Sequence, residues 1–234
     1  METMYPSDDP YLNHRRPLPP LELGSADTAL LVIDMQYSDA SLDHGIFALK
    51  RARGLNAGLE YYAREMHRIV PNIFRLQEAC RAAGIEVMFS RIQSATMDGR
   101  DRGRIHKELE IFCAPGSKEA AILDEIAPVG DEILFSKTTG SVFNSSAIHH
   151  VLLTMGIRNL IMCGVMTSGC VESAARDATD LGYGVIVVAD ACASWTEELH
   201  QASLRVMHGV FSRVQTLDQV LERIRSGRPA VAAI

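Results

Sequence analysis

The sequence predicts one α/β domain in which a mostly parallel sheet is covered by helices on both faces. Short apolar runs rich in Val, Ile and Leu recur along the chain, and such runs are typical of strands buried on both faces. Segments with helical spacing separate them, and this alternation predicts helices on either side of the sheet. The 234 residues suffice for a single core, and we find no internal repeat or internal linker.

The elements follow one another in a regular order. The predicted strands are Ala29–Asp34, Ile85–Arg91, Glu132–Ser136, Asn159–Cys163, Val185–Ala189 and a weaker Val210–Val214. The predicted helices span roughly 55–83, 117–127, 144–155, 171–181 and 196–208. In the fourth helix small and apolar residues recur at helical spacing, and Gly182 is suited to end it.

The first 24 residues differ from the rest of the chain. They are polar and rich in proline, with little periodicity, so we expect residues 1–24 to form an extended arm. An arm of this kind suits packing against another subunit. Residues 25–234 are expected to form the domain.

Composition limits the partners and the compartment. The net charge of −6 argues against nucleic acid or an anionic membrane as a partner. The N-terminal segment holds no apolar run that resembles a signal peptide or a membrane span. Five cysteines without a CxxC pair predict free thiols in a reducing environment, so we expect a cytoplasmic protein.

Ligands of such sheets bind at the carboxyl ends of the strands, where Cys170 is the most informative residue. It follows the fourth strand in GVMTSGCVESAARDA and stands just before a helical pattern. A thiol in the first turn of a helix is expected to have a lowered pKa and to lie near free backbone N–H groups. The alternative is a buried structural cysteine, which is the common case for cysteine in general.

Asp34 and Lys137 end the first and third predicted strands. Asp34 alone suits a helix cap, a metal ligand or a general base, and Lys137 alone suits a solvated surface charge. Together with Cys170 they supply a base, a cation and a nucleophile. Thiol-based acyl transfer requires these three groups.

Three segments that carry these residues, LLVIDMQ, FSKTTGSVF and CGVMTSGCVESAARDATDLGYGVIVVADACAS, resemble the isochorismatase-like cysteine hydrolase superfamily. The resemblance runs from about Ala26 to the C-terminus. It implies a six-stranded parallel sheet in an α/β/α sandwich, and a homodimer or homotetramer. It also implies Asp34, Lys137 and Cys170 as a catalytic triad and a cis peptide bond between Val165 and Met166. The N–H groups of Met166 and Cys170 would then form the oxyanion hole.

Within that superfamily, the sequence favours hydrolysis of a small ureido or carbamoyl compound of the biuret, triuret, ureidoacrylate or N-carbamoyl amino acid type. The nicotinamidase Asp-x-His metal motif is absent beyond the second strand, and the lone His106 is expected to be solvated. No metal or other cofactor is therefore expected. Isochorismatases that cleave vinyl ethers lack the cysteine. The segments 45–72 and SRIQSATMDGRDR resemble the ureide-hydrolysing members.

Two alternatives stay open: a simple carboxamidase of the nicotinamide or maleamate type, and a non-catalytic binding protein of the same fold. The substrate is in either case expected to be a small molecule. Candidate pocket residues are Tyr37, Arg91, Phe143, Asn144, Met166 and His208. Arg91 suits a substrate carboxylate or carbonyl as well as a salt bridge, and Asn144 suits a urea-like group or a helix cap. Core packing explains the two aromatic residues and Met166 equally well.

Overall fold

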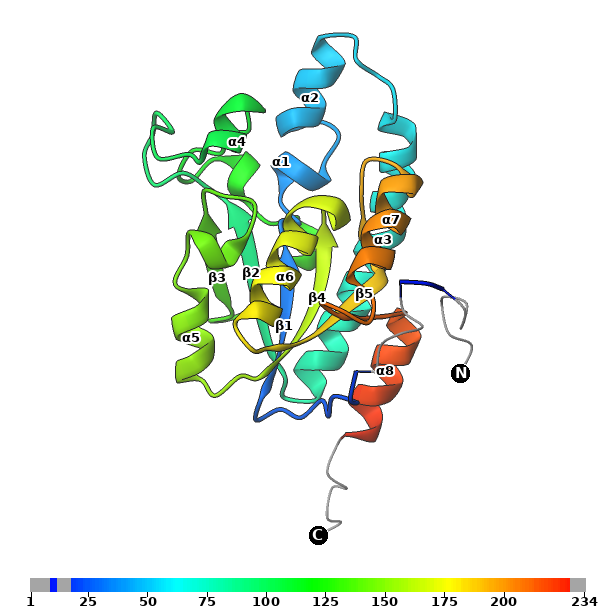
Figure 1. Cartoon of the computed structure of the whole chain (residues 1–234). Helices are drawn as coiled ribbons and strands as arrows, with labels where there is room; N and C mark the ends of the chain where they lie inside the picture. The colour runs from blue at the N-terminus through cyan, green and yellow to red at the C-terminus, as the bar shows by residue number, and fades with distance from the viewer. Residues whose placement is uncertain (1–8, 12–17, 228–234) are drawn as a thin grey trace.

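The computed structural model describes residues 9–11 and 18–227 and has one six-stranded, wholly parallel sheet (Figure 1). The strand order is β3-β2-β1-β4-β5-β6. The strands are β1 (Thr28–Ile33), β2 (Glu86–Ile92), β3 (Ile133–Lys137), β4 (Asn159–Val165), β5 (Gly184–Ala193) and β6 (Arg213–Gln215). The predicted fold class is confirmed.

The strand order reverses direction between β1 and β4, the two central strands. All six residues of β1 are buried, and β4 pairs with it from Thr28↔Asn159 to Ile33↔Gly164. Gly164 has φ +115°, and a Cβ atom there would lie 2.1 Å from the carbonyl oxygen of Ile33, so only glycine permits this close approach. The carboxyl ends of β1 and β4 thus meet at the switch point where ligands of parallel sheets bind.

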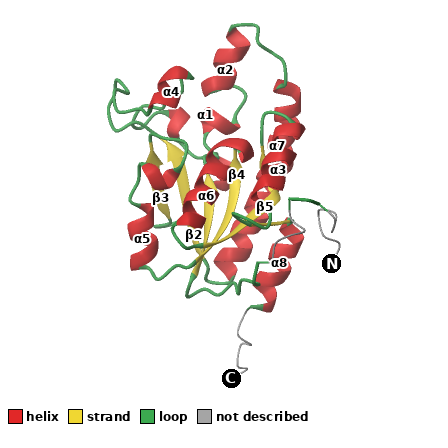
Figure 2. Cartoon of the chain, in the orientation of Figure 1, coloured by secondary structure: helices red, strands yellow, loops and turns green. Residues whose placement is uncertain are grey.

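Helices cover both faces of the sheet (Figure 2). On one face, α3 (Leu59–Ala82) packs against α8 (Leu217–Ser226) and the central strands. On the other face lie α5 (Ile148–Thr154), α6 (Glu172–Asp180) and α7 (Glu197–Met207). The resulting three layers are the predicted α/β/α arrangement.

Residues 37–58 and 94–113 lie over the carboxyl ends of the strands, and we call them the cover (Figure 1). They contain the short helices α1 (Tyr37–Ala40), α2 (Gly45–Ala52) and α4 (Arg104–Glu108). An aromatic cluster of Phe47, Tyr62 and Trp195, with ring centroids 4.5–5.7 Å apart, fixes α2 to α3. The cover is therefore attached to the domain by buried side chains.

The helix predicted over 117–127 is wrong. The structure has two 3₁₀ turns there, Lys118–Ala120 and Asp124–Ile126. Between them, Ile122 forms an antiparallel bridge with Gln36, and the N–H of Leu123 donates to the carbonyl of Met35 over 2.9 Å. Backbone groups that extend the end of β1 are unavailable for a helix, so tertiary pairing overrides the local pattern.

The last predicted strand is shorter and later than expected, because the N–H groups of residues 210–212 turn back to the carbonyl of Met207. Four helices lie outside the predicted helical segments: α1, α2, α4 and α8. Thr216 begins α8 with a capping box in which it pairs with Gln219.

The predicted arm falls largely outside the described residues. Where it is described, it contacts its own domain: Asp9 forms an ion pair with Arg205, and Arg213 donates to the carbonyl of Pro19. Packing of the arm on another subunit stays a prediction. In the described ranges, no helix has both the length and the apolar character needed to cross a membrane.

Candidate active site

Asp34 stands immediately after β1 in a left-handed backbone conformation, φ 52°, which is uncommon for a residue other than glycine. Its side chain is 1% exposed. The hydroxyl of Ser90 on β2 donates to Oδ1 over 3.0 Å, and the ammonium of Lys137 lies 2.8 Å from Oδ2. Both carboxylate oxygens are therefore held in place, and the backbone conformation that turns the side chain into the site is stabilised by these contacts.

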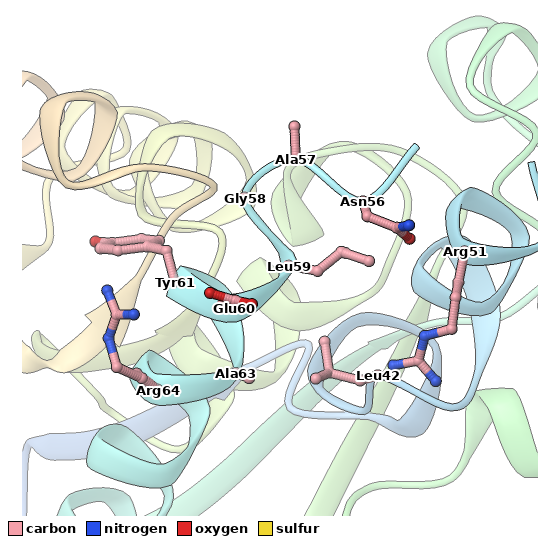
Figure 3. A pocket seen from close by; sticks show the side chains of 10 residues that line it. All are labelled: Leu42, Arg51, Asn56, Ala57, Gly58, Leu59, Glu60, Tyr61, Ala63 and Arg64. Carbon is pink, nitrogen blue, oxygen red and sulfur yellow. The ribbon is translucent and has the colours of Figure 1, made fainter. Parts of the chain in front are cut away.

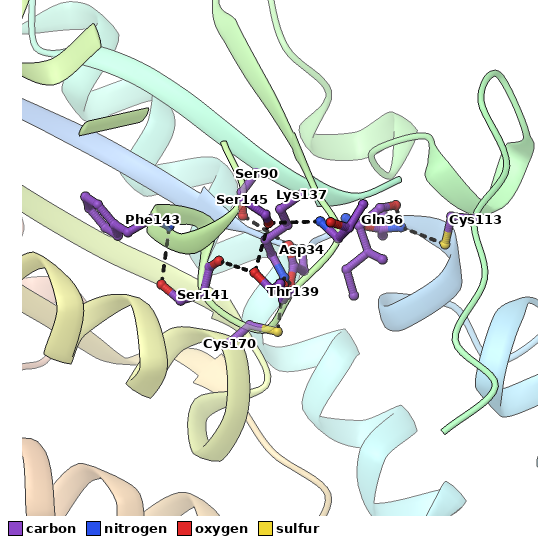
Figure 4. A network of polar contacts seen from close by, with 12 residues as sticks. Asp34, Gln36, Ser90, Cys113, Lys137, Thr139, Ser141, Phe143, Ser145 and Cys170 are labelled. Carbon is purple, nitrogen blue, oxygen red and sulfur yellow. Dashed lines mark hydrogen bonds and ion pairs between the residues drawn. The ribbon is translucent and has the colours of Figure 1, made fainter. Parts of the chain in front are cut away.

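Lys137 ends β3, and its side chain is completely buried. Its Nζ atom contacts Asp34 at 2.8 Å, the carbonyl of Thr139 at 2.9 Å and Sγ of Cys170 at 3.3 Å (Figure 4). The first contact is an ion pair and the other two are hydrogen bonds, so the ammonium group is held by three different elements. Burial alone would lower its pKa, but the charge of Asp34 and the contact with Cys170 raise that pKa above the ordinary value. Lys137 is thus a permanent cation.

Cys170 lies in a single π turn, Thr167–Val171, that continues directly into α6. The N–H groups of Gly169 and Val171 both donate to the carbonyl of Met166, which stabilises the turn. Cys170 is partly exposed, whereas the other four cysteines are buried and unpaired. The peptide bond between Val165 and Met166 is cis, at the bond where the sequence resemblance locates one.

The prediction of a lowered thiol pKa is wrong. Burial raises the pKa of the Cys170 thiol, Lys137 opposes this rise, and the charge of Asp34 together with a hydrogen bond to it adds to the rise. Lys137 lowers the thiol pKa, but its charge is shared with Asp34, so this lowering does not outweigh the effects of burial and of the carboxylate. Cys170 is therefore a neutral thiol that is hydrogen-bonded to the adjacent carboxylate.

Two groups of residues support the three side chains, and the sequence named only one of them, Thr167, as a candidate helix cap. After β3, Thr139 contacts Ser145 at 2.8 Å and donates to the carbonyl of Ser141, which fixes the loop whose Thr139 carbonyl holds Lys137 (Figure 4). Behind the nucleophile turn, the hydroxyl of Thr167 lies 2.8 Å from Nδ1 of His200 on α7. Serine, threonine and histidine are common enough that no sequence signal distinguishes these positions.

His106 is not solvated, contrary to our expectation. It is 3% exposed, on the inner side of α4. The preceding Gly103 donates to the carbonyl of Thr138 over 2.8 Å and so holds α4 against the loop after β3. Burial lowers the pKa of His106 to about 4, with Lys137 lowering it further and Asp34 raising it. A neutral imidazole thus lies within electrostatic range of the site.

Asp39, on α1, is a second acid near Asp34 that the sequence did not single out. It is 6% exposed, and burial, together with the charge of Asp34, raises its pKa to about 7. Its position a few residues after a strand-ending acid is the signal that was overlooked. Such a segment lies at the same carboxyl edge as the strand end itself.

Two candidate pocket residues lie at the margin of the site or away from it. Tyr37 begins α1 and packs edge-on against His44, with the ammonium of Lys118 3.7 Å from the centre of its ring. Arg91 pairs in register with Ser136 and bonds its hydroxyl over 3.1 Å. Side chains alternate along strands, so Arg91 lies on the face of the sheet opposite to Ser90 and Lys137. Its guanidinium also donates to the carbonyl of Ala120 over 3.4 Å.

Of the other candidates, Met166 adjoins the turn that carries Cys170, whereas Phe143, Asn144 and His208 contact other parts of the structure. Phe143 packs against Tyr183, with centroids 6.1 Å apart. Asn144 is exposed and donates to Asp177 over 3.0 Å, so it does not cap α5, which begins after Ala147. His208 ends α7 and accepts from the N–H of Val214 over 3.3 Å, which stabilises the turn before β6. Met166 is partly buried and adjoins the nucleophile turn.

Two hollows of the surface lie away from these three side chains. The hollow in Figure 3 measures about 740 Å³ and lies between α2 and the start of α3, lined by Leu42, Arg51, Asn56, Ala57, Gly58, Leu59, Glu60, Tyr61, Ala63 and Arg64. A smaller one of about 270 Å³ adjoins His200. Neither is lined by Asp34, Lys137 or Cys170, so the site is identified by its chemistry and not by its size. Across residues 9–11 and 18–227, no three His, Cys, Asp or Glu side chains converge as metal ligands would.

Comparison with known proteins gives one family and a consistent set of relatives. A model of the isochorismatase domain matches residues 28–219. The chain is 33% identical over 232 residues to ureidoacrylate amidohydrolase RutB of Pseudomonas syringae pv. syringae (strain B728a), which covers 90% of this chain and 91% of the relative. It is 31% identical over 235 residues to the RutB protein of Stutzerimonas stutzeri (strain A1501), which covers 91% of this chain and 88% of the relative.

The fold is also similar to solved structures. A crystal structure of a cysteine hydrolase from Pseudomonas syringae pv. phaseolicola 1448A superposes with a TM-score of 0.77 at 26% identity. The match covers 91% of this chain and 99% of that chain. The similarity therefore extends over nearly the whole of both molecules.

Proposed function

This chain belongs to the isochorismatase family and is a hydrolase of carbon–nitrogen bonds other than peptide bonds, and from that premise we propose its mechanism and substrate class. Cys170 attacks the carbonyl of a small ureido or carbamoyl compound. A thioester forms, ammonia departs, and water releases the product. Asp34 moves the protons, and Lys137 fixes the two reacting groups.

One observation carries this proposal: a single buried ammonium group contacts both the acid and the thiol. Nζ of Lys137 lies 2.8 Å from Asp34 and 3.3 Å from Sγ of Cys170. A buried ion pair costs desolvation energy that its attraction only partly repays. A site of this kind suits a chemical role, because a nucleophile and its base must be held at hydrogen-bond distance.

The first half of the reaction uses the neutral thiol. Asp34 already accepts a hydrogen bond from Cys170, so proton transfer to the carboxylate needs no rearrangement. As the proton leaves, sulfur forms a bond to the substrate carbonyl carbon and the carbonyl oxygen becomes an oxyanion. We assign the N–H groups of Met166 and Cys170 as donors to that oxyanion, in the manner of other acyl-transfer enzymes.

The second half returns the proton. Protonated Asp34 gives its proton to the departing nitrogen as the C–N bond breaks, so ammonia leaves and a thioester remains on Cys170. Asp34 then takes a proton from water, whose oxygen attacks the thioester carbonyl. The C–S bond breaks, sulfur recovers the proton, and the acid product departs.

The substrate class rests on the relatives. The curated proteins at about 30% identity are named ureidoacrylate amidohydrolases, and their alignments extend over about nine-tenths of this chain. We therefore propose a compound of the biuret, triuret, ureidoacrylate or N-carbamoyl amino acid type. Each offers a carbonyl that bears an NH₂ group, which becomes the departing ammonia.

The experiment is an ammonia-release assay on biuret, triuret, ureidoacrylate, N-carbamoylglycine and nicotinamide, with the wild type and Cys170→Ala. We expect release from at least one ureide and none from Cys170→Ala. Treatment with a chelator leaves the rate unchanged. Cys192→Ala, at a buried cysteine remote from Lys137, is the matched control and retains the activity.

The same panel separates the alternatives. Release from nicotinamide alone would identify a simple carboxamidase in place of a ureide hydrolase. Full activity of Cys170→Ala would contradict the assignment of Cys170 as the nucleophile. No release from any compound would contradict the proposed substrate class.

A further inference from the structure

Asp39 is a buried acid that the mechanism above does not use. It lies on α1, five positions after Asp34 and at the same edge of the sheet. The segment is rigid, because the hydroxyl of Tyr62 donates to the carbonyl of Asp39 over 2.7 Å. The next turn is fixed as well: a Cβ at Gly45, which has φ +52°, would lie 2.4 Å from the carbonyl of Ser38.

The carboxyl group of Asp39 has only part of the hydrogen bonding that its burial requires, because Ser38 is the one side chain that hydrogen-bonds to it among the described residues. It is 6% exposed, and its Oδ2 atom makes no hydrogen bond to any described residue. A buried polar group without a partner costs about 1–3 kcal/mol, and native structures rarely retain one without a reason. A site that binds a small molecule provides such a reason, since the ligand then supplies the missing hydrogen bond.

The charges around Asp39 define which ligand fits. Asp39 interacts electrostatically with ionisable groups from five parts of the chain. They are Asp34 after β1, Lys137 on β3, Tyr62 on α3, Cys113 in the cover and Cys170 before α6. Asp34 and Lys137 neutralise one another in an ion pair. Burial raises the pKa values of the two thiols and of Tyr62, which keeps all three neutral. Without Asp39 the surroundings are therefore neutral overall.

We propose that Asp39 is a substrate-binding residue that accepts a hydrogen bond from an N–H group beyond the scissile bond, and so selects uncharged ureides over carboxylate-bearing ones. This inference rests on the proposed function and deepens it by naming the substrate class. In biuret, the second amide supplies the N–H group. In N-carbamoylglycine or ureidoacrylate, a carboxylate replaces that amide and is repelled by the acid.

The ionisation of Asp39 is expected to make substrate binding depend on pH. Only the ionised carboxylate accepts at both oxygens, and the pKa of about 7 means that this form increases between roughly pH 6 and 8. The KM for an N–H-rich substrate is therefore expected to fall as the pH rises through about 7.

The test compares biuret with N-carbamoylglycine, two ureides of similar size. In the wild type, we expect kcat/KM for biuret to exceed that for N-carbamoylglycine by about tenfold or more. In Asp39→Asn, KM for biuret rises about tenfold, the preference between the two substrates falls towards one, and the fall of KM with pH disappears. Asp43→Asn, at an exposed acid of the same segment, is the matched control and behaves as the wild type.

Two results would overturn the inference. One is hydrolysis of N-carbamoylglycine by the wild type as efficiently as that of biuret. The other is an Asp39→Asn variant whose KM values and pH profile are unchanged, or whose kcat alone falls equally for both substrates, since that is a purely structural effect. The thermal midpoint of each variant shows whether it is folded.

Calorimetric titration of Cys170→Ala and of Cys170→Ala/Asp39→Asn with biuret separates this inference from the proposed function. Binding that weakens about tenfold in the double variant supports the role of Asp39 even if the wild type releases no ammonia. Turnover of ureides with no difference in binding between the two variants supports the function and contradicts the role of Asp39.

Discussion

The carboxyl edge of the sheet and the cover above it hold buried polar groups in opposite ways. At the edge, Asp34 accepts from Ser90 and forms an ion pair with Lys137, which also donates to the carbonyl of Thr139 and to Cys170. In the cover, Oδ2 of Asp39 and Nδ1 of His106 are buried but have no hydrogen-bond partner among the described residues. The acid at the edge is thus paired with a cation, whereas among the described residues no ion pair includes the acid of the cover.

This difference separates two tasks. A catalytic group must keep its geometry in every cycle, so its contacts come from strands and from the loop fixed by Thr139. A group that recognises substrate must exchange water for substrate, so some of its hydrogen-bonding capacity must not be used by other groups of the protein. We infer that the edge supplies the reaction and that the cover supplies the selectivity. Substitutions in the two regions should then have different signatures.

The largest effect is expected for Lys137→Met, which leaves Asp34 buried without its cation. We expect a loss of about 3–5 kcal/mol in the free energy of unfolding. Activity should fall about 10²–10⁴-fold, because an isolated buried carboxyl becomes protonated and cannot accept the thiol proton. Urea unfolding and steady-state kinetics measure the two losses.

A double variant, Asp34→Asn/Lys137→Met, is the control for that prediction. It removes both charges, so much of the lost stability should return while the activity stays absent. Recovery of activity in the double variant, or a single variant as stable as the wild type, would contradict the view that the edge is a coupled ion pair.

The next effect concerns Asp39 in the cover. Its pKa is about 7 in the folded protein against an ordinary 3.8, so the folded state binds more protons between these values. Stability is therefore lost as the pH rises from about 4 through 7. Asp39→Asn removes this loss, and its stability relative to the wild type should be greater at pH 8 than at pH 5 by on the order of 2–4 kcal/mol.

Urea unfolding at the two pH values measures this difference. The exposed Asp43→Asn serves as control and should show no dependence of this kind. An Asp39→Asn variant that is equally stabilised at both pH values would mean that the carboxyl group does not ionise near neutrality in the folded protein.

A smaller effect of the opposite sign is expected for His106. Burial lowers its pKa to about 4 from an ordinary 6.5, so the unfolded state binds more protons in this window and stability is lost as the pH falls through it. His106→Gln should reduce the loss between pH 7 and pH 5 by on the order of 1–2 kcal/mol. His67→Gln, at an exposed histidine of α3, should leave the loss of stability between pH 7 and pH 5 unchanged. Equal effects of the two substitutions would contradict the argument from burial.

The smallest effect is expected for Asn144→Ala. The side chain is exposed and bonds only Asp177 among the described residues, so stability should change by about 0.5 kcal/mol or less. The KM for the best ureide should stay within about twofold of the wild-type value. A tenfold rise in KM would show that Asn144 reaches the substrate after all.

The sequence predicts the edge far better than the cover, for a physical reason. Buried parallel strands have a distinct composition, and their carboxyl ends meet at a known place, so Asp34, Lys137 and Cys170 could be grouped before the structure was seen. The thiol pKa could not be predicted with them. The direction of the Cys170 pKa shift depends on how completely Asp34 neutralises Lys137. That depends on distances between side-chain atoms, which the sequence does not define.

The cover has no comparable pattern. Its helices are short, and His106 looks like one polar residue among many charged ones until α4 is seen to turn it inward. Similarly, Arg91 follows a strand pattern as Lys137 does, yet the alternation of side chains puts it on the other face. Asn144 and His208 failed to reach the site because their partners, Asp177 and the N–H of Val214, come from elements whose positions only the fold defines.

The most direct test of the account is mass spectrometry of enzyme that is quenched with acid during turnover of the best ureide. The account predicts a peptide containing Cys170 whose mass is increased by the acyl group of the substrate, and no such adduct on the other four cysteines or in Cys170→Ser. Sustained turnover with an unmodified Cys170 peptide, together with an active Cys170→Ala variant, would contradict it.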